Sequence, residues 1–260
     1  MSSRLVYHPL RARLLQVLRV DELSPRLRRI TLTGPGLEDF TSPAPDDHVR
    51  LIFPAAGASQ PMLPTFGAQG ASFPEGQRPI ARDYTPRAFD KQRQTLTLDF
   101  VLHGDGQASA WAAQARPGDT IAVAGPRASR ILAPHAHNHW LLLGDETALP
   151  AIARWLEWIP PTHQVTVRVE IETAAECIPL PAHDGLDLGW VQRRAPAQGC
   201  ALLAHITALA LRPGYAWIAC ESAQMRDLRQ HLLTERGWPR EHLYAAGYWK
   251  RGTADHDDEH

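Results

Sequence analysis

The stretch His139–Trp158, HWLLLGDETALPAIARWLEW, decides the fold class of the second half of the chain. Its apolar start is typical of a buried strand, and Ala148–Trp158 is typical of a helix, which Pro160 and Pro161 end. The turn between them places a helix N-terminus at the carboxyl end of a buried strand, where open α/β sheets bind ligands. The turn is not GxGxxG, so the standard dinucleotide fingerprint is absent, and an ordinary βα turn is the alternative.

The same alternation continues toward the C-terminus. Apolar runs bounded by turn residues predict further strands, and the segments between them predict helices, the last of which has Ser222 as its expected N-cap. Strands that alternate with helices predict a parallel sheet that is covered on both faces. The strands are expected at 164–171, 189–192, 215–220 and 243–248, and the helices at 201–211 and 223–236.

Toward the N-terminus the sequence pattern changes to short runs of alternating apolar and polar residues, which Pro and Gly interrupt. In Thr95–Leu102, TLTLDFVL, the apolar residues recur at every second position, which predicts a half-buried strand. Several such runs predict an antiparallel barrel or sandwich, and Pro54–Pro79 is expected to be a long loop on it. We therefore expect two domains and a tail, at residues 1–134, 138–252 and 253–260.

Composition narrows the function classes. The 260 residues carry 27 Lys and Arg against 28 Asp and Glu, a net charge of −1, which excludes the overall basic field of a nonspecific nucleic-acid binder. Cys177, Cys200 and Cys220 share no CxxC spacing, so neither a disulfide framework nor a cysteine metal site is indicated. The chain has no apolar run of 18 residues and no secretory h-region at its start, so we expect a soluble cytoplasmic protein without membrane contact.

Two motifs in the first half carry chemistry. In Arg82–Arg87, RDYTPR, the two Arg can pair with phosphate oxygens, Tyr84 offers a face for stacking, and Thr85 offers a hydroxyl. In Asp99–Trp111, DFVLHGDGQASAW, a glycine-rich turn precedes a helix, which is an arrangement that binds anions. Solvated charges at an exposed strand end are the alternative for the first motif.

RDYTPR, DFVLHGDGQASAWAAQARPGDTIAVAGPR, LLLGDETALPAIARWLE and GYWKRG together resemble the siderophore-interacting protein family, the flavin-dependent ferric-siderophore reductases of the ferredoxin-NADP reductase-like superfamily. The resemblance covers residues 10–252. It implies a six-stranded antiparallel β-barrel that holds FAD, followed by a parallel-sheet α/β domain that binds NADPH or NADH. No acid–base pair, nucleophile or metal ligand is then expected, because the cofactor carries the electron chemistry and the iron arrives chelated.

The resemblance also implies roles for individual residues. Tyr84 would stack on the flavin ring, Thr85 would lie near its reactive nitrogen, and an Arg would hold the diphosphate. Asp99 and Val101 would lie beside the ring through backbone groups, and the nicotinamide cofactor would enter beside the turn after the first α/β strand. The cofactor-binding set is Arg82, Asp83, Tyr84, Thr85, Arg87, Asp99, Val101, His103, Ala108, Ser109, Trp111, Asp145, Thr147 and Ala148, and the cations for an anionic ferric siderophore are Arg50, Arg127 and Lys250.

Several alternatives stay open. A general flavin or ferredoxin reductase would need no basic substrate pocket, and a siderophore-binding module would need no flavin. The identity of the electron donor also stays open. Arg193 and Arg194 suit the 2′-phosphate of NADPH, whereas Glu170 and Glu172 suit the ribose hydroxyls of NADH. A ferredoxin is the third alternative. A monomer is expected from the chain length and organisation. The alternating His135, His137 and His139 could bind a metal, although a solvated junction is favoured, and Cys220 is favoured as an inert buried thiol.

Overall fold

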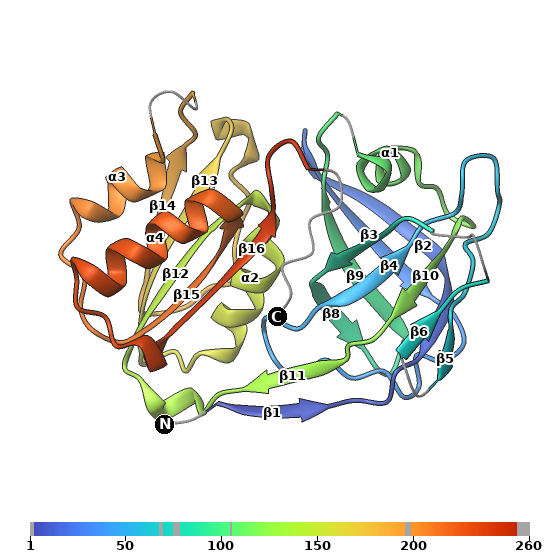
Figure 1. Cartoon of the computed structure of the whole chain (residues 1–260), viewed down its shortest axis with the longest axis horizontal. Helices are drawn as coiled ribbons and strands as arrows, with labels where there is room; N and C mark the ends of the chain where they lie inside the picture. The colour runs from blue at the N-terminus through green and yellow to red at the C-terminus, as the bar shows by residue number, and fades with distance from the viewer. Residues whose placement is uncertain (1–2, 68–69, 75–78, 105, 196–198, 254–260) are drawn as a thin grey trace. The chain divides into compact units, whose positions relative to one another are not determined.

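The computed structural model describes residues 3–67, 70–74, 79–104, 106–195 and 199–253. Contacts within the chain separate two compact units, residues 3–131 and residues 132 onward (Figure 1). The expected tail lies outside the described residues, apart from Thr253. Within the described residues, no helix has the length and apolar character needed to cross a membrane.

The first unit is a curled antiparallel sheet in the strand order β7-β4-β10-β2-β3-β9-β8. Its two edge strands, β7 and β8, are consecutive in the chain and separated only by Thr85. If β7 and β8 are counted as one interrupted strand, the sheet has six strands and both of its edges belong to that strand. The sheet therefore closes on itself, which confirms the expected antiparallel barrel. The strands are β2 (Ala12–Ser24), β3 (Leu27–Thr33), β4 (Val49–Ile52), β7 (Ala81–Tyr84), β8 (Pro86–Asp90), β9 (Thr95–Val101) and β10 (Thr120–Ala124).

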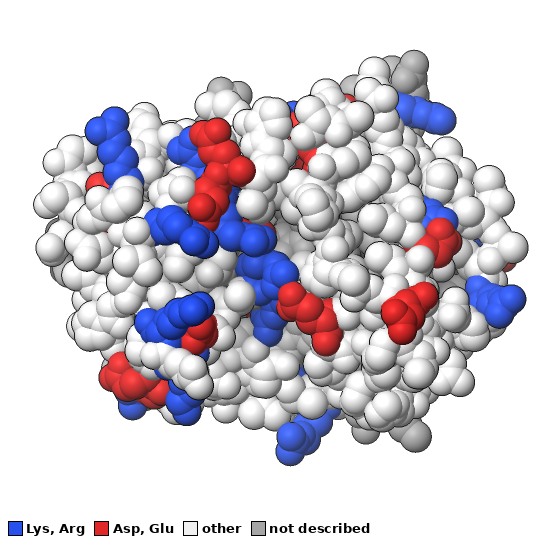
Figure 2. Space-filling view, turned by 180° about the vertical axis from the view of Figure 1, so that it is seen from behind, with Lys and Arg blue, Asp and Glu red and all other residues white. Residues whose placement is uncertain are grey.

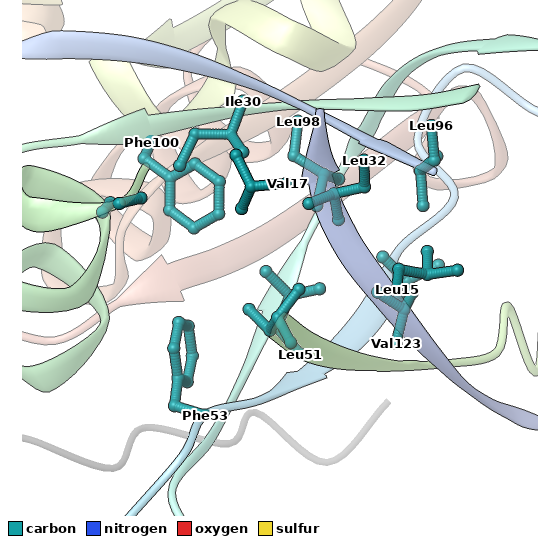
Figure 3. Close-up of a cluster of buried hydrophobic side chains, with 14 of the residues drawn as sticks. Leu15, Val17, Ile30, Leu32, Leu51, Phe53, Leu96, Leu98, Phe100 and Val123 are labelled. Carbon is teal, nitrogen blue, oxygen red and sulfur yellow. The ribbon is translucent and has the colours of Figure 1, made fainter. Parts of the chain in front are cut away.

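Alternation along these strands fills the barrel with apolar side chains (Figure 3). On β9, Leu96, Leu98 and Phe100 are fully buried, as the period of two predicts. Each such side chain contributes roughly 1.5–3 kcal/mol when it leaves water, so the interior is a packed core. The other members labelled in Figure 3 are Leu15, Val17, Ile30, Leu32, Leu51, Phe53 and Val123.

Three smaller features complete this unit. A two-stranded ribbon pairs β1 (Arg4–Tyr7) with β11 (Ala128–Ile131). The segment 54–79, expected to be a loop throughout, contains the short hairpin β5 (Thr65–Gly67) and β6 (Gly70–Ser72), so that expectation was wrong in part. Helix α1 (Gln107–Gln114) follows the glycine-rich turn, as predicted.

The second unit is a five-stranded sheet in the order β14-β13-β12-β15-β16, and every adjacent pair is parallel. The predicted parallel sheet is therefore confirmed. The order reverses between β12 and β15, which makes the carboxyl ends of these two strands the switch point where such sheets bind ligands. The strands are β12 (His139–Asp145), β13 (Gln164–Ile171), β14 (Leu186–Gln192), β15 (Tyr215–Glu221) and β16 (Leu243–Trp249).

Helices cover both faces of this sheet. On one face, Trp155 of α2 (Leu149–Trp158) packs 5.7 Å from Trp140 and 6.3 Å from Trp217, between ring centroids. On the other face, α3 (Ala201–Thr207) and α4 (Ser222–Thr234) cover an apolar cluster that includes Leu141, Leu143, Ala216 and Ile218. Short 3-10 turns lie at η1 (Pro134–Ala136), η2 (Glu146–Ala148), η3 (Ala174–Glu176) and η5 (Arg240–His242).

Two details differ from the sequence expectation. Helix α3 ends at Thr207 rather than at residue 211. The N-cap of α4 is Glu221 rather than Ser222, because the Glu221 carboxylate accepts hydrogen bonds from the backbone N–H groups of Ala223 and Gln224. A carboxylate is favoured at that position by the partial positive charge of the helix N-terminus.

Candidate cofactor and substrate sites

The break between β7 and β8 presents the residues of the RDYTPR motif. Tyr84 ends β7 and packs on the buried Phe100, with ring centroids 4.4 Å apart, while its own side chain is partly exposed. Burial raises the pKa of the Tyr84 phenol, so this ring stays neutral at physiological pH. Thr85 occupies the break and is buried. An aromatic ring next to a hydroxyl at a strand interruption fits the edge and face of a planar ligand.

The charged residues of this segment lie on the same pair of strands. Arg50 of β4 lies opposite Asp83 of β7, and their side chains form an ion pair at 3.2 Å. Arg82 donates to the carbonyl of Ala81, and Arg87 is half-buried on β8. The structure thus brings four of the five predicted flavin residues of the motif onto β7 and β8, with Thr85 between the two strands.

Helix α1 begins directly after the glycine-rich turn and packs on the barrel core. Trp111 packs 5.8 Å from Phe100 and 5.6 Å from Phe53, between ring centroids, which fixes the helix on the barrel. The N-cap, Gly106, has no side chain, so no side-chain cap occupies the helix N-terminus. A Cβ atom at Gly106 would lie 2.7 Å from Cε1 of His103, so a larger residue there would require the exposed His103 ring to move. Backbone N–H groups in the first turn can therefore bind a diphosphate.

The remaining residues of the second motif line the end of β9 and the start of α1. Ser109 accepts a hydrogen bond from the backbone N–H of His103 at 2.9 Å, and Ala108 is buried beside it. Asp99 is buried and forms a two-pronged ion pair with Arg29, at 2.7 and 2.8 Å. Its carboxylate is thus engaged inside the protein, while Val101 is half-buried at the strand end.

These observations test whether FAD fits the barrel. The aromatic face of Tyr84, the uncapped N-terminus of α1 and the arginines of β7 and β8 match the ring and diphosphate of a flavin dinucleotide. The described residues therefore fit the cofactor.

In the second unit, the turn after β12 is tightly packed. A Cβ atom at Gly144 would lie 2.4 Å from Cβ of Ala148 and 2.8 Å from the carbonyl oxygen of Ala219, so only glycine allows η2 to fold back on the sheet. Ala148 is fully buried, and Thr147 is half-buried. The structure brings Asp145, Thr147 and Ala148 together at the switch point.

Asp145 is 1% exposed, and its carboxylate accepts four hydrogen bonds from the protein. Oδ1 accepts from the backbone N–H and the hydroxyl of Thr147, at 3.0 and 2.5 Å. Oδ2 accepts from the backbone N–H of Glu221 at 3.1 Å and from the indole N–H of Trp249 at 2.7 Å. Burial raises the pKa of Asp145, and these hydrogen bonds oppose that rise.

Arg193, which follows β14, is the centre of an ion cluster. Its guanidinium donates to Glu146 at 2.5 Å, to Glu170 at 2.8 Å and to Glu172 at 2.9 Å. Burial raises the pKa of Glu146, and Asp145 adds to that rise. The sequence offered Arg193 as a partner for a 2′-phosphate, but could not show that three carboxylates already surround it. Arg194 is exposed.

Lys250 is exposed directly after β16, and Arg127 is exposed directly before β11. Within the described residues, Lys and Arg gather locally on the face shown in Figure 2, and most of that face is uncharged. This distribution agrees with a net charge near zero.

Two other features of the sequence have structural explanations. Among the described residues, no group of three or more His, Cys, Asp or Glu side chains could hold a metal ion, and His137 instead packs on His242 at 4.6 Å between ring centroids. Cys220 is fully buried, and burial raises the pKa of its thiol well above its usual range. Such a thiol is unreactive at neutral pH.

Comparison with known proteins assigns both units to related families. Residues 16–130 match the model of the siderophore-interacting FAD-binding domain, and residues 137–252 match that of the siderophore-interacting protein. The NADPH-dependent ferric-chelate reductase of Escherichia coli is 38% identical over 248 residues, which cover 94% of this chain and 95% of the relative. The ferric vibriobactin reductase ViuB of Vibrio cholerae is 30% identical, over 95% and 94% of the two chains.

Solved structures agree. The siderophore utilization protein from T. fusca superposes with a TM-score of 0.89 at 34% identity, over 98% of this chain and 99% of that one. The siderophore-interacting protein SipS from Aeromonas hydrophila gives 0.76 at 33% identity, over 94% and 93%. A ferredoxin NADP+ reductase from Neisseria gonorrhoeae with bound FAD and NADP gives 0.62 at 17% identity, over 92% and 99%, and shares the fold.

Proposed function

Because this chain belongs to the siderophore-interacting protein family, we propose that it reduces ferric siderophores, passing electrons from NADPH or NADH through FAD to the chelated iron. The observation that carries this proposal is the 38% identity to a ferric-chelate reductase across nearly the full length of both chains. We place the reaction in the cytoplasm, where reduced nicotinamide nucleotides are available.

The barrel would hold the flavin through the residues described above. Tyr84 would stack on the ring with Thr85 beside it, Arg82 or Arg87 would pair with the diphosphate, and the first turn of α1 would bind the diphosphate through backbone N–H groups. Asp83, Asp99, Val101, His103 and Trp111 would shape the surroundings of the ring and the adenosine. FAD, when bound, supplies the conversion of a two-electron hydride donor into two one-electron transfers.

One NAD(P)H carries two electrons, which reduce two ferric chelates to the ferrous state and leave NAD(P)+ and one proton. No side chain has to form a bond to the iron, because the chelate already supplies its ligands. Hard oxygen donors hold Fe(II) less tightly than Fe(III), so reduction weakens the chelate and releases the metal. The protein's part is to bind the donor and the acceptor and to orient them.

We further propose that Arg50, Arg127 and Lys250 attract the negative charge of the chelate. All three are exposed, and Arg50 keeps this role although it pairs with Asp83, because a surface ion pair contributes little and exchanges readily. Thr147 and Ala148 mark the strand end at which the nicotinamide nucleotide would enter.

The experiment is to compare Lys250→Ala with the wild-type protein. We expect an increase of roughly tenfold in KM for an anionic ferric chelate, with FAD content and the rate of nucleotide oxidation by oxygen unchanged, since one charge-assisted contact is lost. Lys91→Ala, which removes the other lysine of the chain, is the control. An unchanged KM in Lys250→Ala would favour a general flavin or ferredoxin reductase, which needs no basic pocket.

A further inference from the structure

Lys250 directly follows β16, the last described strand of the second unit. Both of its neighbours are held by hydrogen bonds. The indole N–H of Trp249 donates to Oδ2 of Asp145 at 2.7 Å, and the backbone N–H of Arg251 donates to Oε1 of Glu221 at 3.2 Å. The backbone around Lys250 is therefore fixed on either side.

Further contacts strengthen this attachment. The Ser222 hydroxyl donates to the carbonyl of Trp249 at 3.1 Å, and the carbonyl of Lys250 accepts from the N–H of Thr253 at 3.1 Å. The pairing of β15 with β16 shifts between Cys220 and Glu221, so that Glu221 lies opposite Trp249. A shift of this kind re-aims the side chains that follow it.

Asp145 links the carboxyl ends of three neighbouring strands by hydrogen bonds. Its carboxylate joins the end of β12, through Thr147, to the end of β15, through Glu221, and to the end of β16, through Trp249. All of its hydrogen bonds come from the protein, and it is 1% exposed. A buried carboxylate that accepts four hydrogen bonds can accept few more from a nucleotide. Asp145 therefore fits a positioning role better than the cofactor contact expected from the sequence.

We propose, on the basis of the function proposed above, that Asp145 and Trp249 are positioning residues that hold Lys250 in place for an anionic ferric chelate. Ordering the backbone of a residue in advance spares the entropy that binding would otherwise cost. The hydrogen bond from Trp249 is the contact to test, because an N–H donated to a carboxylate is among the stronger hydrogen bonds.

The test is Trp249→Phe in the full-length, flavin-loaded protein. This change removes the indole N–H and keeps an aromatic ring, while Asp145 retains its three other donors, so the buried carboxylate stays satisfied. Trp238→Phe is the matched control, since it removes one indole hydrogen bond, to the carbonyl of His242 at 3.3 Å, from the same unit. The probe is an anionic iron(III) tris-catecholate complex, and its Kd is measured by equilibrium dialysis.

We expect Trp249→Phe to raise Kd about fivefold to tenfold, because the chelate would then have to order the backbone of Lys250 on binding, and Trp238→Phe to leave it unchanged. In a Lys250→Ala background, Trp249→Phe should add nothing, because the lysine it positions is absent. Ser222→Ala, which removes the hydroxyl that donates to the carbonyl of Trp249, should also raise Kd and replaces Trp249→Phe if that variant folds poorly.

Two results would overturn the inference. If Lys250→Ala weakens binding and Trp249→Phe does not, Lys250 acts without this support and the proposed function stands. If Trp249→Phe weakens binding equally with and without Lys250, Trp249 acts independently of the lysine. Wild-type affinity in Lys250→Ala would instead refute the proposed role of Lys250 itself.

Discussion

Replacement of Arg193 by Met should destabilise the second unit strongly. Arg193 pairs with Glu170, whose side chain is 1% exposed, and with Glu146, whose side chain is 9% exposed. Among the described residues, Oε2 of Glu170 has no hydrogen-bond partner, and without Arg193 the other oxygen would keep the amide of Gln224 at 3.2 Å. The variant would therefore leave two buried carboxylates without their cation.

The magnitude follows from burial. Removal of one partner of a buried ion pair costs about 3–5 kcal/mol, whereas the pair with Glu172, 47% exposed, adds less than about 1 kcal/mol. For a unit of this size we expect the melting temperature to fall by roughly 10–20 °C. Arg193→Met combined with Glu170→Gln should recover part of the loss, because one of the stranded charges is then gone.

Tryptophan fluorescence during urea unfolding is the assay. All tryptophans except Trp111 lie after residue 131, so the signal reports mainly on the second unit. Arg226→Met, at an exposed position on α4, is the control and should change the free energy of unfolding by less than about 0.5 kcal/mol. A loss in Arg193→Met of less than about 1 kcal/mol would refute the view that this cluster is buried and mutually dependent.

Three further predictions concern packing, protonation and cofactor binding. Gly144→Ala should destabilise the second unit by about 1–3 kcal/mol in the same unfolding assay, because its Cβ would overlap Ala148 and the carbonyl of Ala219; wild-type stability would show that the turn can relax. Burial lowers the pKa of His163, and the nearby His135 and His183 lower it further. The ring is therefore protonated at a lower pH in the folded unit than in the unfolded chain. The contribution of His163 to the free energy of unfolding is present above about pH 6.5 and is lost as the pH falls toward the lowered pKa of the folded state. His163→Gln should therefore make the melting temperature depend less on pH between about pH 7.5 and 5.5. A pH dependence equal to that of the wild type would contradict this. Tyr84→Ala should raise the Kd of FAD about tenfold while Tyr84→Phe keeps it near wild type, as titration of flavin fluorescence would show; equal losses in both would place the binding energy in the hydroxyl rather than in the ring.

Local patterns predicted much of the fold. Strands β12, β15 and β16 are mostly apolar and have Gly or Pro near their ends, whereas β9 and β13 alternate at every second residue, so these elements could be located from the sequence. Strand β2 is difficult to locate from the sequence, because the charged Arg13 is buried among its apolar residues. That arginine is satisfied by the carbonyls of Gly36 and Gly125, and the second is 112 residues away.

The same limit applies to the sites. The RDYTPR residues and the turn before α1 are contiguous in sequence, so their candidate role could be seen without a structure. The partners of Asp145 could not, since Glu221 and Trp249 are 76 and 104 residues further along the chain. Trp249 stands next to Lys250 in GYWKRG, and that adjacency was the only signal for its position in the sequence.

The most direct test of the central claim is the visible absorption spectrum of the purified protein, followed by anaerobic addition of NADPH or NADH and then of a ferric siderophore. The account predicts flavin bands that bleach with the nucleotide and recover when the ferric chelate is added. Bands that only a reduced ferredoxin bleaches would keep the reductase and change its donor. A colourless protein that takes up no added FAD would contradict the account and leave a siderophore-binding module in its place.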